Sequence, residues 1–104
     1  MRPIRHWLVF LVLTSATPTP ARAETIRIRI DKMEYSPAEV KAKVGDTVEW
    51  INADILAHTA TVKNDWEVVM PSRKSGNAVM QKAGEVDYYC RFHPNMTGRI
   101  IVSD

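Results

Sequence analysis

The sequence has a single cysteine, Cys90, and so it has no internal disulfide. This excludes the small disulfide-stapled folds that many exported domains use. A C-x-x-C-H motif is also missing, which excludes covalently attached c-type haem. After Ala23, no apolar pattern with a helical period is long enough for a helix, and a helical bundle is therefore excluded. No cluster of basic residues marks a nucleic-acid-binding surface.

Long apolar runs are missing too. The main apolar run, Trp7 to Leu13, has seven residues, whereas a membrane-spanning helix needs roughly 20. It follows Arg2 and Arg5 and is followed by Ala21-Arg22-Ala23. A positive start, a short apolar centre and an A-x-A end are typical of a secretory signal peptide. We therefore predict a leader at residues 1–23, cleaved after Ala23, and a periplasmic or otherwise exported protein. A retained membrane anchor is the alternative.

Cleavage after Ala23 would change both the size and the charge of the protein. It would leave residues 24–104, which are 81 residues and enough for one small domain. The 14 basic residues would fall to 11, because Arg2, Arg5 and Arg22 lie in the leader, and the net charge would be −1 instead of +2. His6 would be lost as well and is not a candidate ligand. An apolar core of this size is marginal, so a bound metal that joins distant segments would add stability.

Apolar and polar residues alternate through most of the remaining chain, as they do in half-buried β-strands. Turn signals such as Ser36-Pro37 and Gly45-Asp46 separate the alternating segments. The predicted strands cover residues 26–30, 40–44, 47–51, 58–62, 66–70, 78–81, 86–91 and 99–102. In the third of them, either Trp50 or Ile51 is expected to face the core. About seven to eight short strands predict an all-β fold, a Greek-key β-sandwich.

The densest group of possible metal ligands lies near the C-terminus. Cys90, His93 and Met96 follow one another at intervals of three residues, as C-x-x-H-x-x-M. The alternation of the preceding strand puts Cys90 on its inner face, where the following loop can close around an ion. A thiolate, an imidazole and a weak thioether suit a soft or borderline transition metal, above all copper. A blue-copper centre needs a second imidazole, and His58 is the only other histidine outside the leader.

Each of these residues has a plainer explanation when it is taken alone. A lone cysteine is commonly an inert core residue. A histidine at a strand start can be satisfied by a loop carbonyl, and a methionine can simply pack. Together, at these spacings, His58, Cys90, His93 and Met96 favour one metal site. Ligation also accounts for an unpaired thiol in an exported protein, because a bound metal protects the thiolate from oxidation.

These segments resemble the cupredoxins, the type 1 blue-copper family, and within that family the amicyanins. The segments that carry the resemblance are Val48 to Asn52, His58, Gly84 to Cys90, His93-Pro94-x-Met96 and Gly98 to Val102. The resemblance runs from Thr25 to the C-terminus, and the short C-x-x-H-P-x-M spacing is what indicates the amicyanins. It implies an eight-stranded Greek-key sandwich with copper at one end. His58, Cys90 and His93 would be equatorial ligands and Met96 the axial ligand.

The resemblance also implies a function. Cupredoxins are electron carriers and not enzymes, with one copper ion per chain cycling between Cu(II) and Cu(I). The implied partners are redox proteins, with a periplasmic dehydrogenase as electron donor and a c-type cytochrome as acceptor. A monomer is the expected state, with no nucleic acid and no membrane insertion after cleavage. The edge of His93 is the expected electron port, with Phe92, Pro94 and Met70-Pro71 as an apolar rim.

The sequence departs from the amicyanin pattern at three points. Thr59 stands where amicyanins often have an asparagine that braces the ligand loop, and we expect its hydroxyl to keep this brace in altered form. Phe92 and Asn95 replace a proline and an aromatic residue around His93, so the partner-facing surface is expected to differ. The shorter N-terminal part predicts that an edge strand is missing.

Other functions would use the same residues. The main alternative is a periplasmic copper-binding or delivery protein that does not cycle electrons, although a fixed thiolate binds copper too tightly for easy release. A thiol enzyme would need Cys90 as nucleophile and a histidine as base, but the sequence shows no orienting acid or oxyanion element. A structural zinc site wants more cysteines or histidines and no methionine. In the plainest alternative, the protein is a β-sandwich in which the spacing of the four candidate ligands is a coincidence and they form no metal site.

Overall fold

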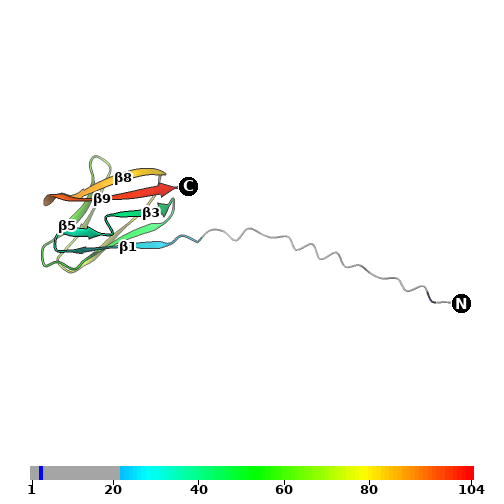
Figure 1. Ribbon diagram of the computed structural model, residues 1–104, viewed down its shortest axis with the longest axis horizontal. Helices are drawn as coiled ribbons and strands as arrows, with labels where there is room; N and C mark the ends of the chain where they lie inside the picture. The colour runs from blue at the N-terminus through cyan, green and yellow to red at the C-terminus, as the bar shows by residue number, and fades with distance from the viewer. Residues whose placement is uncertain (1–2, 4–21) are drawn as a thin grey trace.

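The computed structural model describes residue 3 and residues 22–104, and every regular element in this part is a β-strand (Figure 1). The nine strands are β1 (Thr25–Asp31), β2 (Glu34–Ser36), β3 (Glu39–Lys43), β4 (Thr47–Asn52), β5 (His58–Val62), β6 (Trp66–Met70), β7 (Ser75–Val79), β8 (Gly84–Cys90) and β9 (His93–Ser103). Nearly all of the predicted leader lies outside the described residues, so its cleavage stays a prediction. No helix in the described part is long and apolar enough to cross a membrane.

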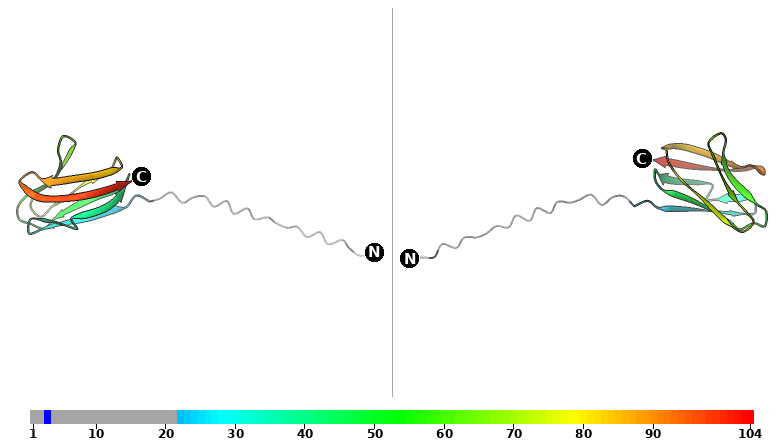
Figure 2. Two further views of the ribbon diagram at one scale, coloured as in Figure 1. Left: turned by 45° about the horizontal axis from the view of Figure 1, so that its top comes forward. Right: turned by 180° about the vertical axis from the view of Figure 1, so that it is seen from behind.

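The strands form two sheets that pack face to face (Figures 1 and 2). One sheet has the order β2-β1-β4-β7 and the other has the order β3-β9-β8-β5-β6. Most neighbours are antiparallel, but β1 runs parallel to β4 and β3 runs parallel to β9. The chain changes sheet between β2 and β3 and at several later connections, as in Greek-key sandwiches. The predicted all-β sandwich is confirmed, with nine strands instead of the predicted seven to eight.

The inner faces of the strands supply one apolar core between the sheets. Successive side chains of a strand point to opposite faces, and the buried positions follow this period of two. Of the two alternatives in β4, Trp50 faces the core and is fully buried, whereas Ile51 is half-buried. It meets Tyr88 edge to face, with ring centroids 5.5 Å apart. Full burial of a large apolar side chain stabilises a fold by roughly 1.5–3 kcal/mol, so these inner faces hold the two sheets together.

Several details differ from the predicted strands. β2 was not predicted as a strand, and its last residue, Ser36, was predicted as part of a turn; its three residues pair with β1. β7 begins at Ser75, three residues before the predicted strand, and the alternation is hidden there because the inward-facing Gly76 has no side chain. Its inner face approaches β6 so closely that a Cβ at Gly76 would lie 2.6 Å from Cγ1 of Val68. Val44, predicted to face inward, lies just beyond β3 and is 42% exposed.

The hairpin of β8 and β9 places much of the site at one end of the sandwich. Only Arg91 and Phe92 form the turn, and β9 begins at His93. The structure therefore puts His93 and Met96 on a strand, where a loop was predicted. The register shifts between Tyr89 and Cys90, and irregularities of this kind re-aim side chains near functional sites. The C-terminus and the start of β1 lie at the opposite end of the sandwich (Figure 1).

Candidate metal centre

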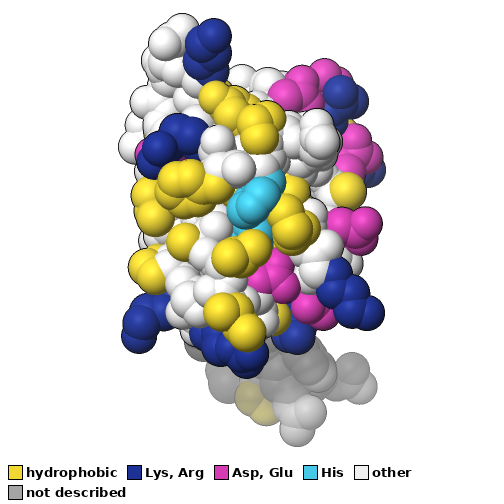
Figure 3. Space-filling model, turned by 90° about the vertical axis from the view of Figure 1, so that its left-hand side faces the viewer, with side chains coloured by type: hydrophobic (Ala, Val, Ile, Leu, Met, Phe, Trp, Pro, Cys, Tyr) yellow, Lys and Arg dark blue, Asp and Glu magenta, His cyan; other side chains and the backbone are white. Residues whose placement is uncertain are grey.

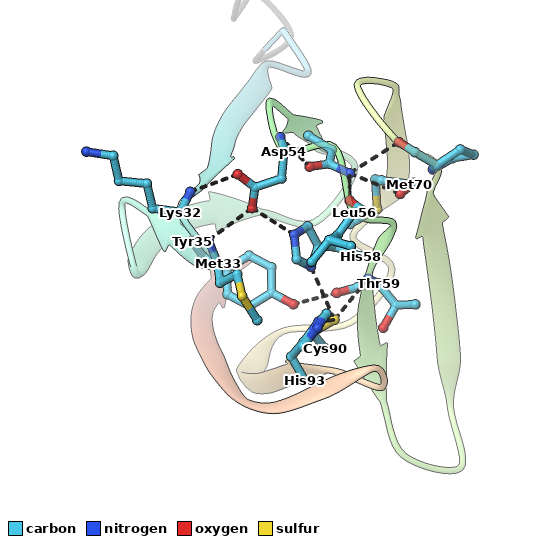
Figure 4. A network of polar contacts seen from close by, with 12 residues as sticks. Lys32, Met33, Tyr35, Asp54, Leu56, His58, Thr59, Met70, Cys90 and His93 are labelled. Carbon is cyan, nitrogen blue, oxygen red and sulfur yellow. Dashed lines mark hydrogen bonds and ion pairs between the residues drawn. The ribbon is translucent and has the colours of Figure 1, made fainter.

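Three of the four predicted ligands come together where three strands end or begin (Figure 4). His58 opens β5, Cys90 ends β8 and His93 opens β9. The Cys90 sulfur lies 3.7 Å from Nδ1 of His58 and 3.9 Å from Nδ1 of His93. All three ligand atoms lie within 4.8 Å of one another. Bonds from a metal to sulfur or nitrogen are about 2.0–2.3 Å long, so one ion can contact all three atoms.

Met96, the fourth predicted ligand, is buried on β9 and is 5% exposed. It belongs to the same core cluster as Cys90. Its role as an axial ligand stays a prediction. Met70, predicted as part of the core or of an exposed rim, is fully buried and lies opposite His58 in the pairing of β5 with β6. Met70 therefore cannot form part of an exposed rim.

The site is closed on one side and open on the other. His58 and Cys90 have no exposed surface, whereas His93 is half-buried. Figure 3 shows histidine at the surface of this end of the molecule, surrounded by hydrophobic side chains. His93 is thus the ligand candidate that links the buried thiol to the outside.

Asp54 sets the orientation of His58 from the far side of the imidazole ring. Its Oδ2 lies 2.8 Å from Nε2 of His58. The same carboxylate accepts the backbone N–H groups of Lys32 and Met33, each at 2.9 Å. Burial opposes ionisation of Asp54, but the hydrogen bonds that it accepts outweigh burial and hold the pKa of its carboxyl below its usual range. Because an ionised carboxylate only accepts, Nε2 of His58 carries the proton and Nδ1 keeps its lone pair for a metal.

Asn52 in turn holds the loop that carries Asp54. Its side-chain amide donates to the carbonyl of Leu56 at 2.9 Å, and its Oδ1 accepts the N–H of Asp54 at 2.9 Å. Two carbonyls at the end of β6 lie 3.2 and 3.3 Å from the same amide nitrogen. Asn52 is almost completely buried. Neither Asn52 nor Asp54 was predicted to act on the site, although an acidic residue four positions before a candidate ligand is a usable signal.

Thr59 braces Cys90 and the turn that follows it. Its backbone N–H points at the Cys90 sulfur, 3.4 Å away. Its hydroxyl oxygen accepts the N–H of Arg91 at 2.8 Å, and its carbonyl accepts a hydrogen bond from the hydroxyl of Tyr35. The brace predicted for Thr59 is present, with the hydroxyl as acceptor in the bond to Arg91. An N–H aimed at the sulfur stabilises a thiolate and tunes the metal that it binds.

The donor set fits copper better than the alternatives. One thiolate and two imidazoles suit copper, and a buried weak thioether is the usual axial addition in blue-copper sites. A structural zinc site is usually built from four cysteine or histidine ligands, and the described residues bring together three such groups. A thiol nucleophile needs an accessible sulfur, whereas Cys90 is completely buried. The site is built to hold an ion.

Comparison with known proteins identifies the class. The sequence matches the family described as "Cupredoxin-like domain" over residues 4–102. The chain therefore belongs to the cupredoxin-like family, and its fold and its cluster of two histidines and a cysteine agree with this.

Within that class the similarity is to amicyanins. The chain is 31% identical to amicyanin of Paracoccus versutus over 88% of this chain and 77% of that protein. It is 37% identical to amicyanin of Paracoccus denitrificans over 74% of this chain and 64% of that protein. A solved structure of the reduced Cu(I) form of an amicyanin mutant has a TM-score of 0.67 at 32% identity, covering 76% of this chain and 82% of that one. The predicted resemblance to amicyanin is confirmed.

Proposed function

We propose that this protein is a type 1 copper protein that carries single electrons between redox proteins in the periplasm. The observation that carries the proposal is the meeting of His58, Cys90 and His93 within 4.8 Å at one end of a cupredoxin sandwich. Similarity to amicyanins, one of them solved in a Cu(I) form, supports copper as the ion. His58, Cys90, His93 and Met96 would hold one copper per chain.

When bound, copper supplies a one-electron couple between Cu(II) and Cu(I). The residues of the chain keep the ligand atoms in place while the charge changes. Asp54 fixes the ring of His58, and the N–H of Thr59 fixes the sulfur of Cys90. Since these groups are buried or anchored by hydrogen bonds, little rearrangement needs to accompany electron transfer. No residue has to bind or convert a substrate, so we propose a carrier and not an enzyme.

His93 is the proposed route for the electron to the surface, because it alone of the three is partly exposed. Exposed apolar side chains occur next to it in sequence and in the loop before His58: Phe92 is 46%, Leu56 52% and Ile55 72% exposed. A small apolar face of this kind suits a weak, transient encounter with a redox partner. The proposed partners are a periplasmic dehydrogenase as donor and a c-type cytochrome as acceptor, met by a monomeric carrier.

The proposal includes a leader at residues 1–23 and a mature domain at 24–104. The start of β1 at Thr25 supports this boundary, because cleavage after Ala23 would leave the whole strand intact. Ala23 and Glu24 are exposed, so the cleavage site would be clear of the folded core.

A redox titration of Glu24–Asp104 loaded with one equivalent of Cu(II) tests the proposal. Reduction and reoxidation should each take one electron per chain. The copper should stay bound in both states when a competing Cu(I) chelator is present. Loss of copper to the chelator on reduction would contradict a carrier and support the alternative of copper binding and delivery.

A further inference from the structure

A chain of polar contacts links the brace at Thr59 to an ion pair at the surface. Oγ1 of Thr59 lies 2.9 Å from Oγ1 of Thr61, which donates to Oε1 of Glu67 at 2.8 Å. Nε of Arg91 donates to the same carboxylate oxygen at 2.7 Å. The backbone N–H of Arg91 donates to Oγ1 of Thr59 at 2.8 Å. The contacts therefore form a closed ring that begins and ends at Arg91.

The strands bring these four residues together. Thr59 and Thr61 are two positions apart on β5, so their side chains share one face of the sheet. Glu67 lies directly opposite Thr61 on the edge strand β6. Arg91 follows β8, which pairs with the other side of β5. The ring thus ties three neighbouring strands together beside the metal centre.

The carboxylate decides the direction of the two hydrogen bonds in the ring that the threonine hydroxyls donate. The guanidinium of Arg91 and the hydroxyl of Thr61 hold the pKa of Glu67 below its usual range, so Glu67 is ionised and only accepts. Thr61 must give its single proton to Glu67, and it can then only accept from Thr59. Thr59 must give its proton to Thr61, which leaves its lone pairs free for the N–H of Arg91.

We infer that Glu67 and Thr61 are positioning residues for the copper site, although neither touches a ligand candidate. They fix the hydroxyl of Thr59 as an acceptor for Arg91, the residue directly after Cys90. The same Thr59 presents its N–H to the Cys90 sulfur. The ring therefore holds both the residue after the thiolate and the donor aimed at it. This inference rests on the proposed copper function only for its effect on the metal.

Two pairs of variants test the ring. Thr61→Val removes the hydroxyl but keeps the shape, and Thr61→Ser keeps the hydroxyl. Glu67→Gln replaces the accepting carboxylate by an amide that can also donate. Its matched control is Asp87→Asn, which breaks the ion pair between Arg99 and Asp87, 2.8 Å long and exposed on the same sheet. That pair makes no contact with Thr59.

The first readout is amide hydrogen exchange at Arg91 in the copper-free protein. Thr61→Val and Glu67→Gln should speed this exchange roughly fivefold to tenfold, which is the effect of losing one ordinary hydrogen bond. Thr61→Ser and Asp87→Asn should leave it within about twofold of the unaltered protein. Equal exchange in Thr61→Val and Thr61→Ser, or in Glu67→Gln and Asp87→Asn, would overturn the inference.

The second readout is the thiolate-to-copper absorption band after addition of Cu(II). The wavelength of the band should change in Thr61→Val and Glu67→Gln, and it should be unchanged in Thr61→Ser and Asp87→Asn. A band that is the same in all four variants would overturn the positioning role. Should even the unaltered protein give no band, the proposed function fails, while hydrogen exchange still decides whether the ring positions Arg91.

Asp46 binds Glu24, the residue that cleavage after Ala23 would make the first of the mature protein. The almost completely buried carboxylate of Asp46 accepts the N–H of Glu24 at 2.9 Å and the N–H of Lys43 at 2.8 Å. The carbonyl of Glu24 accepts the N–H of Thr47 at 2.9 Å. Glu24 is therefore already held at the start of the domain, with its nitrogen directed at a carboxylate.

We propose that Asp46 is the binding site for the amino terminus of the mature protein. Cleavage after Ala23 would turn the N–H of Glu24 into an ammonium group, and the hydrogen bond from a neutral amide to the carboxylate would become an ion pair. An ammonium group beside a carboxylate adds the attraction of opposite charges to the hydrogen bond, and this attraction is stronger in a partly buried site than in water. Removal of the leader would then stabilise the domain as well as release it. This proposal depends on the leader at residues 1–23 proposed above.

The test compares Glu24–Asp104 with Ala23–Asp104, each with Asp46 and with Asp46→Asn. The two lengths differ by one exposed residue, but only the shorter has its ammonium group at Glu24. The shorter form should have a Tm higher by several degrees, and Asp46→Asn should abolish the difference. Equal Tm values for the two lengths with Asp46 present would overturn the proposal. So would an exported protein whose mass shows a first residue other than Glu24.

Discussion

Replacing Asp54 by asparagine should weaken copper binding without removing any ligand. The carboxylate accepts three donors, namely Nε2 of His58 at 2.8 Å and the N–H groups of Lys32 and Met33 at 2.9 Å. An asparagine has only one accepting oxygen, so its amide N–H₂ must face at least one of these donors. Even where the amide oxygen takes the place of Oδ2, which serves both His58 and Met33, it is a neutral acceptor and holds the proton on Nε2 of His58 less strongly than the carboxylate does.

The expected magnitude follows from the general behaviour of residues that orient metal ligands. Loss of such a partner typically lowers metal affinity about 10- to 100-fold, which corresponds to about 1.4–2.7 kcal/mol of binding free energy. The assay is a competition titration of Cu(II) between the protein and a chelator of known affinity. Asp65→Asn is the control, because it removes the same charge from the exposed turn between β5 and β6, away from the site.

Equal copper affinities for Asp54→Asn and Asp65→Asn would contradict this prediction. That result would mean that the packing around His58 holds the ring without the carboxylate. A loss of affinity in both variants would point instead to a general effect of net charge on copper binding.

Three further predictions concern the fold. Gly98→Ala should lower the stability by about 1–3 kcal/mol, because a Cβ there would overlap the buried ring of Tyr88; an unchanged Tm would contradict this. Tyr88→Phe should keep or raise the Tm, because the Tyr88 hydroxyl is buried without a hydrogen-bond partner in the described part of the chain, and a marked fall would reveal a partner. Hydrogen bonds from Glu24 and Lys43 hold the pKa of Asp46 below its usual 3.8. Asp46 should therefore contribute its full stability at a pH above 3.8 and lose this contribution as the pH falls through the lower pKa of the native state. The difference in urea midpoint between the unaltered protein and Asp46→Asn should close below pH about 4. A difference that stays constant with pH would contradict this role of Asp46.

The sequence predicted the sandwich because its strands follow binary alternation. Ile28 and Ile30 on β1, or Val40 and Ala42 on β3, are buried because every second residue faces the core. β7 was misplaced because its inner positions include Gly76, a residue without a side chain to mark the pattern. Its place is set by close packing against Val68, which is a tertiary contact that alternation does not encode.

The candidate ligands could be predicted because three of them are close in sequence and His58 is the only other histidine outside the predicted leader. The groups that orient them could not be predicted in the same way. Asp54 acts on His58 through a loop whose shape depends on a buried amide at Asn52. Glu67 reaches the site through two hydroxyls on a neighbouring strand. Such contacts depend on strand register, which becomes known only when the sheets are assembled.

The claim that this protein is a type 1 copper protein is tested most directly by the visible absorption spectrum of Glu24–Asp104 after addition of Cu(II), measured beside Cys90→Ser. A type 1 site made by His58, Cys90 and His93 predicts an intense thiolate-to-copper band toward the red, with one copper per chain, and its complete loss in Cys90→Ser. A protein that binds copper but stays colourless, or a Cys90→Ser variant with an unchanged spectrum, would contradict the claim.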